Sequence, residues 1–342
     1  MSDSESPSWL PPQLDSVALR LARADQLAYE IGDLAGEWSW NGPLTLTEFR
    51  RGNAMELRVT SIRPIPPIAS LMFSEAVNHL RAALDNVIWH LVRKVNPKLS
   101  QAAERKVNMP IYDDPEKFRK WTEGMVGAKI SAVGPSATLG KRLRQLQPFE
   151  DGQSRVGSIS HRFAAASGQK IEYAHPLLLL QAYSNADKHR AVRFAAERTF
   201  TSDDRTPFGS QDHRHRELRI GDVLGGGQIG QRVEIEMQTA VMIRRPEPFS
   251  AWVSPVRELN KMRGYLSGIA FPTLLTGLAL PIGLPPDIQL GDTGASTRER
   301  IAAGGWSDAP ERLVGPTQDR FKRADARGFV PHEIIYEDTE DS

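Results

Sequence analysis

The chain has 342 residues, which is enough to bury a substantial core as one large domain or two ordinary ones. Its 43 Lys and Arg residues balance 42 Asp and Glu residues, so no strong overall field attracts nucleic acid. The sequence contains no cysteine, which excludes disulfides, thiolate nucleophiles, iron–sulfur clusters and cysteine-based zinc sites.

The N-terminal elements are a flexible arm, a helix and a hairpin. Residues 1–12 are acidic and rich in Pro and Ser, without the basic and apolar regions of a secretory signal, so we expect a cytoplasmic protein. Apolar residues at helical spacing predict an amphipathic helix over 13–36. Alternating apolar residues on both sides of Gly52-Asn53 predict a β-hairpin.

The longest predicted helix covers residues 68–95 and ends before Pro97, because the residue before a proline disfavours helical backbone. One side is apolar and predicts a core-facing stripe of Val77, Leu80, Leu84, Val87, Ile88, Leu91 and Val95. The opposite side carries Glu75, Asn78, His79, Asp85, Asn86, His90 and Arg93. Asn and His are weak helix formers, so their clustering indicates contacts beyond solvation. The alternative is a solvated surface with an Arg81–Asp85 pair at i,i+4.

The middle of the chain has the weakest patterns. Residues 97–173 are polar and rich in Gly, Ser and Pro, and they predict only short helices near 115–122 and 139–146. Pro176 opens a further helix over 176–190. Alternation then predicts strands from Val192 onward, at 217–223 and at 231–243, with the glycines at 225–227 as a hairpin turn.

The C-terminal part begins with a helix capped by Ser254 and started by Pro255. The uncharged stretch Gly264–Pro286 is long enough to span a bilayer, but its prolines would break the backbone pairing in lipid. We therefore expect a helix end followed by an extended segment docked on the core, and no membrane association. Residues 287–342 predict a loosely held tail.

Helices and strands are segregated rather than alternating as βαβ units, which indicates the α+β class. We expect a helical core of three to four long helices with a mostly antiparallel sheet. The predicted organisation is a flexible arm over 1–12, a single α+β domain over 13–286 and the loose tail over 287–342.

The end of the helix at 176–190 gathers polar residues in the stretch "SNADKHRAV". Continuing the helix from its apolar side directs Asp187 and Arg190 inward, and a buried charge is costly unless it is paired. We therefore predict an inter-helix polar cluster that joins Arg81, Asp85, Asp187 and Arg190, with Asn185 and His189 at its rim.

Two stretches carry a family resemblance. The sequences "HLRAALDNVIWHLV" (79–92) and "LQAYSNADKHRAV" (180–192) resemble a bacterial protein family of unknown function with an L-R-x-A-L-D helix and an N-x-D-K-H-R element. With "MPIYDDPEKF" and "LRQLQPF" between them, the resemblance covers about residues 70 to 245 and selects the same polar residues. A weaker likeness is to HEPN helical domains, some of which are RNases that use an Arg and a His on one helix. The matching spacing here, Arg155 to His161, falls in a Gly/Ser-rich stretch that does not predict a helix.

These patterns leave three functions open. In the first, the polar cluster is a structural lock or a small recognition site, with binding residues Asn78, Arg81, Asp85, Asn185 and Lys188. The second is a HEPN-like RNase or nucleic-acid-binding effector that acts as a homodimer on RNA, with His189 as general acid/base and Arg190 and Asp187 beside it. The third is a partner-binding module in a bacterial defence or regulatory complex. No phosphate-loop, dinucleotide or zinc-protease motif is present, so no cofactor or metal is predicted.

Overall fold

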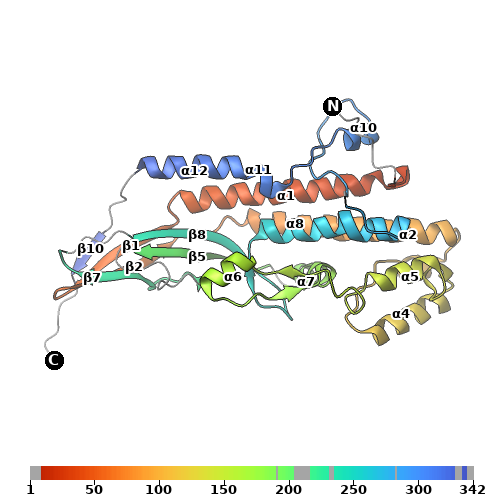
Figure 1. The fold of residues 1–342 in the computed structure, drawn as a ribbon, viewed down its shortest axis with the longest axis horizontal. Coiled ribbons are helices and arrows are strands. Elements are labelled where there is room, and N and C mark those ends of the chain that lie inside the picture. Colours follow the sequence, from red (N-terminus) through yellow and green to blue (C-terminus); the bar gives the residue numbers. More distant parts are fainter. Residues whose placement is uncertain are drawn as a thin grey trace.

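The computed structural model describes residues 9–189, 192–203, 216–230, 235–281, 283–327 and 333–336. Its long helices run along the long axis of the molecule, and the two larger sheets lie at one end (Figure 1). The long helices together with mostly antiparallel sheets confirm the α+β class. Helix α1 packs on α2 and α8, and α2 also packs on α7, so these four helices enclose the main core.

The helices that sequence patterns indicate, α1, α2, α4, α5, α7 and α8, begin and end close to the expected positions. The α-helices are α1 Asp15–Trp40, α2 Ile68–Val95, α3 Gln101–Glu104, α4 Pro115–Gly127, α5 Thr138–Gln145, α6 His161–Ser167, α7 Pro176–His189, α8 Pro255–Tyr265, α9 Phe271–Thr276, α10 Thr297–Ala302, α11 Ala309–Arg312 and α12 Val314–Arg327. Short 3-10 turns, η1 Pro12–Leu14 and η2 Ser131–Val133, precede α1 and α5. Ser254 caps α8 as predicted, because its side chain accepts a hydrogen bond from the Arg257 amide.

The strands in the described parts of the chain form three sheets. They are β1 Leu44–Arg51, β2 Ala54–Ile62, β3 Val156–Gly157, β4 Tyr173–Ala174, β5 Phe194–Asp203, β6 Arg216–Glu217, β7 Val223–Gln228, β8 Ile235–Arg244, β9 Trp252–Val253 and β10 Glu333–Tyr336. The strand orders are β10-β1-β2-β7, β3-β4 and β6-β5-β8-β9. Every pairing between the described strands is antiparallel except that of β10 with β1, so the prediction of a mostly antiparallel sheet is confirmed.

The predicted hairpin is β1–β2, which turns at Gly52-Asn53. Gly52 has φ +57, a left-handed conformation that costs a glycine little. The glycines at 225–227 were predicted to form a second hairpin turn, and this was wrong. They lie inside β7, where Gly226 pairs with Glu56, and a Cβ on Gly226 would sit 3.0 Å from the carbonyl oxygen of Met55. Close strand approach therefore explains these glycines.

The uncharged stretch continues the α8 helix further than the sequence indicated. A five-residue π-helical stretch, η4 Leu266–Ala270, leads directly into α9, which ends at Gly277. The wider π turn before Pro272 accommodates a ring that would break a regular helix. In the described parts of the chain, no helix combines the length and apolarity needed to cross a membrane.

The C-terminal segment is more ordered over residues 287–327 than its polar composition indicates. Helices α10 and α11 start with capping boxes at Ser296 and Asp308. Ile301 and Ala309 are buried against the core. Figure 1 shows α11 and α12 lying along α1, so residues 287–327 pack on the helical core.

Candidate functional site

The polar side of α2 was the predicted site, and its first part meets α7. Asn78 donates a hydrogen bond from Nδ2 to Oδ2 of Asp187 at 3.3 Å. Asn78 is exposed and Asp187 is half-buried, so this contact lies at the surface. Among the described side chains, Asp187 has no ion pair with Arg81. Arg81 and Asp187 therefore do not meet as the predicted four-residue cluster requires.

Arg81 and Asp85 instead hold the backbone of Met109 in the segment between α3 and α4. Arg81 donates from Nη2 to the Met109 carbonyl at 2.9 Å, and the Met109 amide donates to Asp85 Oδ1 at 2.9 Å. Arg81 Nε also donates to Asp85 Oδ2 at 3.2 Å. Both polar groups of a buried backbone unit are thus satisfied by an ion pair from α2, which stabilises this loop.

The remaining predicted residues lie at the end of α7. Asn185 is exposed. Lys188 and His189 belong to the last turn of α7, but their side chains lie outside the described part of the structure, as does the whole of Arg190. The predicted general acid/base and phosphate-stabilising roles of His189 and Arg190 therefore stay predictions.

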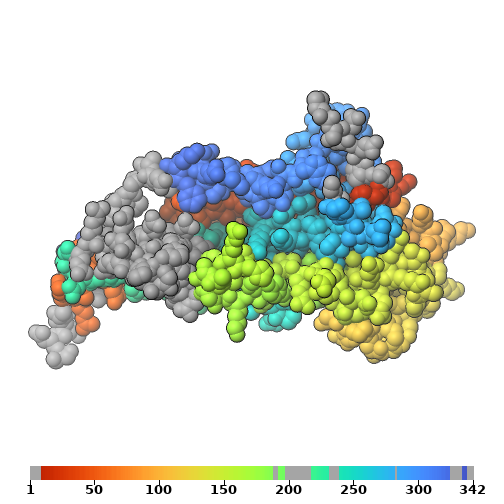
Figure 2. All heavy atoms as spheres, in the orientation of Figure 1, coloured from red at the N-terminus to blue at the C-terminus, as the bar shows by residue number. Residues whose placement is uncertain are grey.

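An open groove lies further along the polar side of α2. It has a volume of about 660 Å³, and one wall is the last turns of α2, which contribute Asn86, Trp89, His90, Arg93 and Lys94. The start of α1 forms the other wall with Pro11, Gln13, Leu14 and Ser16. Figure 2 shows both segments, red and orange, at the same end of the molecule. No Asp or Glu is among the described lining residues, so the groove is basic.

The groove combines an aromatic surface with cationic groups. Trp89 is 37% exposed, and the Arg93 guanidinium lies over its ring at 5.5 Å from the centroid. Arg93 also pairs with Glu104 at 3.4 Å, whereas Lys94 is exposed and has no ion pair within the described residues. Burial and the nearby Lys94 charge lower the pKa of His90, so this imidazole is neutral at pH 7. His90 is therefore a hydrogen-bonding group rather than a third cation.

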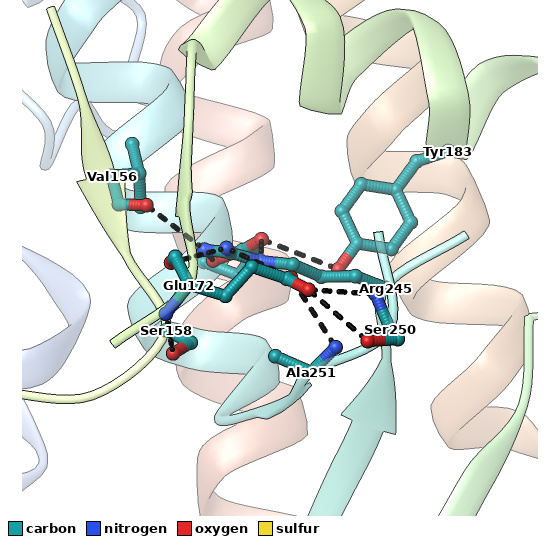
Figure 3. Close-up of polar contacts among 8 residues, drawn as sticks. Val156, Ser158, Glu172, Tyr183, Arg245, Ser250 and Ala251 are labelled. Atoms are coloured by element: carbon teal, nitrogen blue, oxygen red, sulfur yellow. Dashed lines mark hydrogen bonds and ion pairs between the residues drawn. The ribbon is translucent and has the colours of Figure 1, made fainter. Parts of the chain in front are cut away.

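A separate polar network is buried beneath α8 (Figure 3). The Arg245 guanidinium donates to both carboxylate oxygens of Glu258, at 2.8 and 3.0 Å. It also donates to the carbonyls of Glu172 and Val156, at 3.0 and 3.3 Å. The Tyr183 hydroxyl adds a hydrogen bond to Glu258 at 3.3 Å. The network therefore ties β3, β4, α7 and α8 to the end of β8.

Burial dominates the electrostatics of this network. Arg245 is 1% exposed and Glu258 is 2% exposed. Burial raises the pKa of the Glu258 carboxyl, and the bonds from Arg245 oppose this only in part. Burial also raises the pKa of Tyr183 well above its usual value, so its hydroxyl keeps the proton that it donates. Every donor of Arg245 has a protein acceptor, which indicates a structural rather than a ligand-binding role.

His175 forms a second buried contact, at the start of α7. Its Nδ1 accepts a hydrogen bond from the Leu177 amide at 3.2 Å, so the ring proton is on Nε2, which faces Asp151 Oδ2 at 3.4 Å. The Tyr265 hydroxyl donates to the same oxygen at 3.4 Å. Burial lowers the pKa of His175, and the imidazole is held neutral.

Sequence reasoning found part of these sites. The helical period placed Asn86, His90 and Arg93 on one polar side, and the structure puts all three in the groove. Trp89 was missed, and a bulky aromatic beside those polar residues was the available signal. The Arg245–Glu258 pair gives no such signal, because Arg245 follows a strand and Glu258 belongs to a helix. No repeating pattern of the sequence relates the two residues.

No protein-family model matches this sequence, and neither the curated proteins nor the solved structures compared with it contain a significant match.

Proposed function

We propose that this chain binds single-stranded RNA in the groove between the start of α1 and the last turns of α2. The observation that supports this most is the chemistry of the lining: an exposed tryptophan, an arginine and a lysine, with no Asp or Glu among the described lining residues. Single strands bind where a cationic groove follows the backbone and aromatic rings stack on unpaired bases.

Trp89 supplies the stacking surface in this proposal. The Arg93 guanidinium covers one face of the indole, so a base stacks on the other face. The positive charge of this guanidinium beside the ring also attracts the phosphate of a bound nucleotide. A duplex hides its bases within the stack, so this arrangement selects unpaired nucleotides.

Lys94 and Arg93 supply the phosphate contacts. Lys94 has no described carboxylate partner, so binding a phosphate breaks no existing ion pair. Arg93 shares its charge with Glu104, and both side chains are over a third exposed, so this pair is screened and easily opened. The neutral imidazole of His90 and the amide of Asn86 remain to hydrogen-bond a base edge or a ribose hydroxyl.

The proposal concerns binding and assigns no cleavage chemistry to the groove. The RNase alternative with His189 and Arg190 stays a separate prediction. The hydrogen bonds of Arg81 and Asp85 to Met109 support a structural role for these two residues, with a loop backbone as the partner in place of the predicted residues of α7.

The test is fluorescence anisotropy with a labelled single-stranded RNA, measured across a salt series. Removing one phosphate contact with Lys94→Ala should weaken binding and reduce the slope of log K against log salt by about 0.7, the value for one contact to a single strand. Removing the stacking surface with Trp89→Ala should cost about 1–3 kcal/mol and leave the slope unchanged.

The matched controls are Lys261→Ala on α8 and Trp306→Ala, which remove the same groups from exposed positions outside the groove. Both should bind as the wild type does. No binding at low salt, or equal losses in groove and control variants, would contradict the proposed site. Equal affinity for a duplex would contradict the stacking argument.

A further inference from the structure

The α1 wall of the groove is held by an arginine from the far end of the sequence. Arg298, in α10, donates from Nη2 to the Leu10 carbonyl at 2.9 Å. The same side chain pairs with the Asp15 carboxylate at 2.7 Å. Leu10 and Asp15 bracket the short turn η1, and the lining residues Pro11, Gln13 and Leu14 lie between them.

Two sets of local hydrogen bonds hold Arg298 in place. A capping box at Ser296 and Glu299 starts α10, so the first turn that carries Arg298 has a defined direction. Arg300 donates to the carbonyls of Ala295 and Gly291, at 3.0 and 2.6 Å, and closes the loop before this helix.

Ion pairs between arginines and carboxylates fix the position of the rest of the C-terminal segment along α1. Arg312 contacts the buried Asp25 carboxylate at 2.7 Å. Arg320, 3% exposed, pairs with Asp33 and, at 2.9 Å, with Glu37. Figure 1 shows α10, α11 and α12 following α1 from its start to its end. This row of pairs therefore sets where α10 meets the groove wall.

We propose that Arg298 is the positioning residue of the groove, and that the docked segment 287–327 controls whether its α1 wall is formed. Arg298 is not among the lining residues, so it acts on the ligand through the backbone of residues 10–15. Without it, the described start of the chain loses a charge-assisted hydrogen bond at Leu10 and an ion pair at Asp15. The wall then opens and the groove loses its shape. This inference rests on the proposed function for its effect on RNA.

The experiment compares Arg298→Ala, Arg298→Lys and Arg323→Ala in the full-length chain. Arg323 also belongs to the C-terminal segment and pairs with Glu37 at 3.0 Å, but it lies on α12, far along α1 from the groove. Arg323→Ala therefore removes the same charge without touching the wall. Two readouts are needed: amide hydrogen exchange of residues 10–16 without ligand, and RNA affinity across a salt series.

Arg298→Ala should speed exchange over residues 10–16 and weaken RNA binding about tenfold, as expected for one lost charge-assisted contact. The slope of log K against log salt should not change, because no phosphate contact is lost. Arg298→Lys keeps a cation and should recover most of the affinity. Arg323→Ala should match the wild type in both readouts.

Unchanged exchange in Arg298→Ala would overturn the positioning role, and so would unchanged affinity with faster exchange. A reduced salt slope would overturn it too, because Arg298 would then contact the RNA directly. If the wild-type chain does not bind RNA, the proposed function fails, while the exchange readout alone still decides whether Arg298 holds the wall.

Discussion

The buried network of Arg245 and Glu258 provides the most quantitative test of how the fold is held together. In Glu258→Gln, the amide oxygen can still accept one bond, but the amide nitrogen faces an N–H of Arg245, so a donor meets a donor. Arg245 is 1% exposed and stays charged, and its remaining ion pair, with the Glu172 carboxylate at 3.5 Å, is longer and partly exposed. Because leaving a buried charge fully unpaired costs about 3–5 kcal/mol, loss of the closer carboxylate should cost up to that amount. Because whole domains are stable by only about 5–15 kcal/mol, this is a large share.

The replacement Arg245→Met should behave differently from Glu258→Gln, because a carboxyl can protonate and a guanidinium cannot. Burial raises the pKa of Glu258, and removal of the guanidinium raises it further. A raised carboxyl pKa in the folded state contributes stability at low pH that is lost as pH rises from the unfolded to the folded pKa. Arg245→Met should therefore lose more stability relative to the wild type at pH 8 than at pH 5.

Urea unfolding followed by circular dichroism measures these free energies, and Arg244→Met on the exposed side of the same strand end is the control. The double variant Arg245→Met, Glu258→Leu removes both charges. It should be more stable than the sum of the single effects predicts, by about 2 kcal/mol or more. Additive single effects, or a Glu258→Gln variant within about 1 kcal/mol of the wild type, would refute the reasoning.

Three further predictions concern the other contacts. Asp85→Asn should destabilise the chain by about 1–3 kcal/mol and speed amide exchange in the loop before α4, whereas Asp187→Asn at the surface should stay within about 0.5 kcal/mol of the wild type by thermal unfolding. The wild type should lose stability as pH falls below about 6.5, because the lowered pKa of His175 makes the unfolded state bind the proton more tightly. His175→Asn, which retains an acceptor for Leu177, should flatten that pH profile in urea titrations between about pH 7 and 5. Gly226→Val should cost about 1–3 kcal/mol by the same measurement because its Cβ meets a β2 carbonyl.

Local patterns predicted the elements whose signals are local. The helix at 68–95 was found with the same bounds, because a long apolar stripe lies within it and the Asn96-Pro97 stop follows it directly. The hairpin at Gly52 was found because its turn chemistry is carried by two neighbouring residues. The glycines at 225–227 were misinterpreted because a glycine signals either a turn or close strand approach, and only the partner strand β2 distinguishes them.

Contacts between distant segments were not predictable in the same way. The polar segment 287–327 is ordered by arginine pairs with carboxylates on α1, such as Arg312 with Asp25, and composition alone cannot reveal such pairs. Similarly, the helical period gave the direction in which Arg81 and Asp85 point but not their partner. That partner, Met109, comes from an aperiodic loop.

The polar side of α2 divides into two parts with different chemistry. In the first, the donors and acceptors that Arg81 and Asp85 direct at Met109 are already paired, so a ligand there would have to break an internal lock. In the last turns, Trp89 and Lys94 are exposed and point to an open groove. A paired, buried group gives stability, whereas an exposed group with unused bonding capacity is available for recognition. Recognition by this helix is therefore expected at its C-terminal turns, although the sequence clusters its polar residues along the whole length.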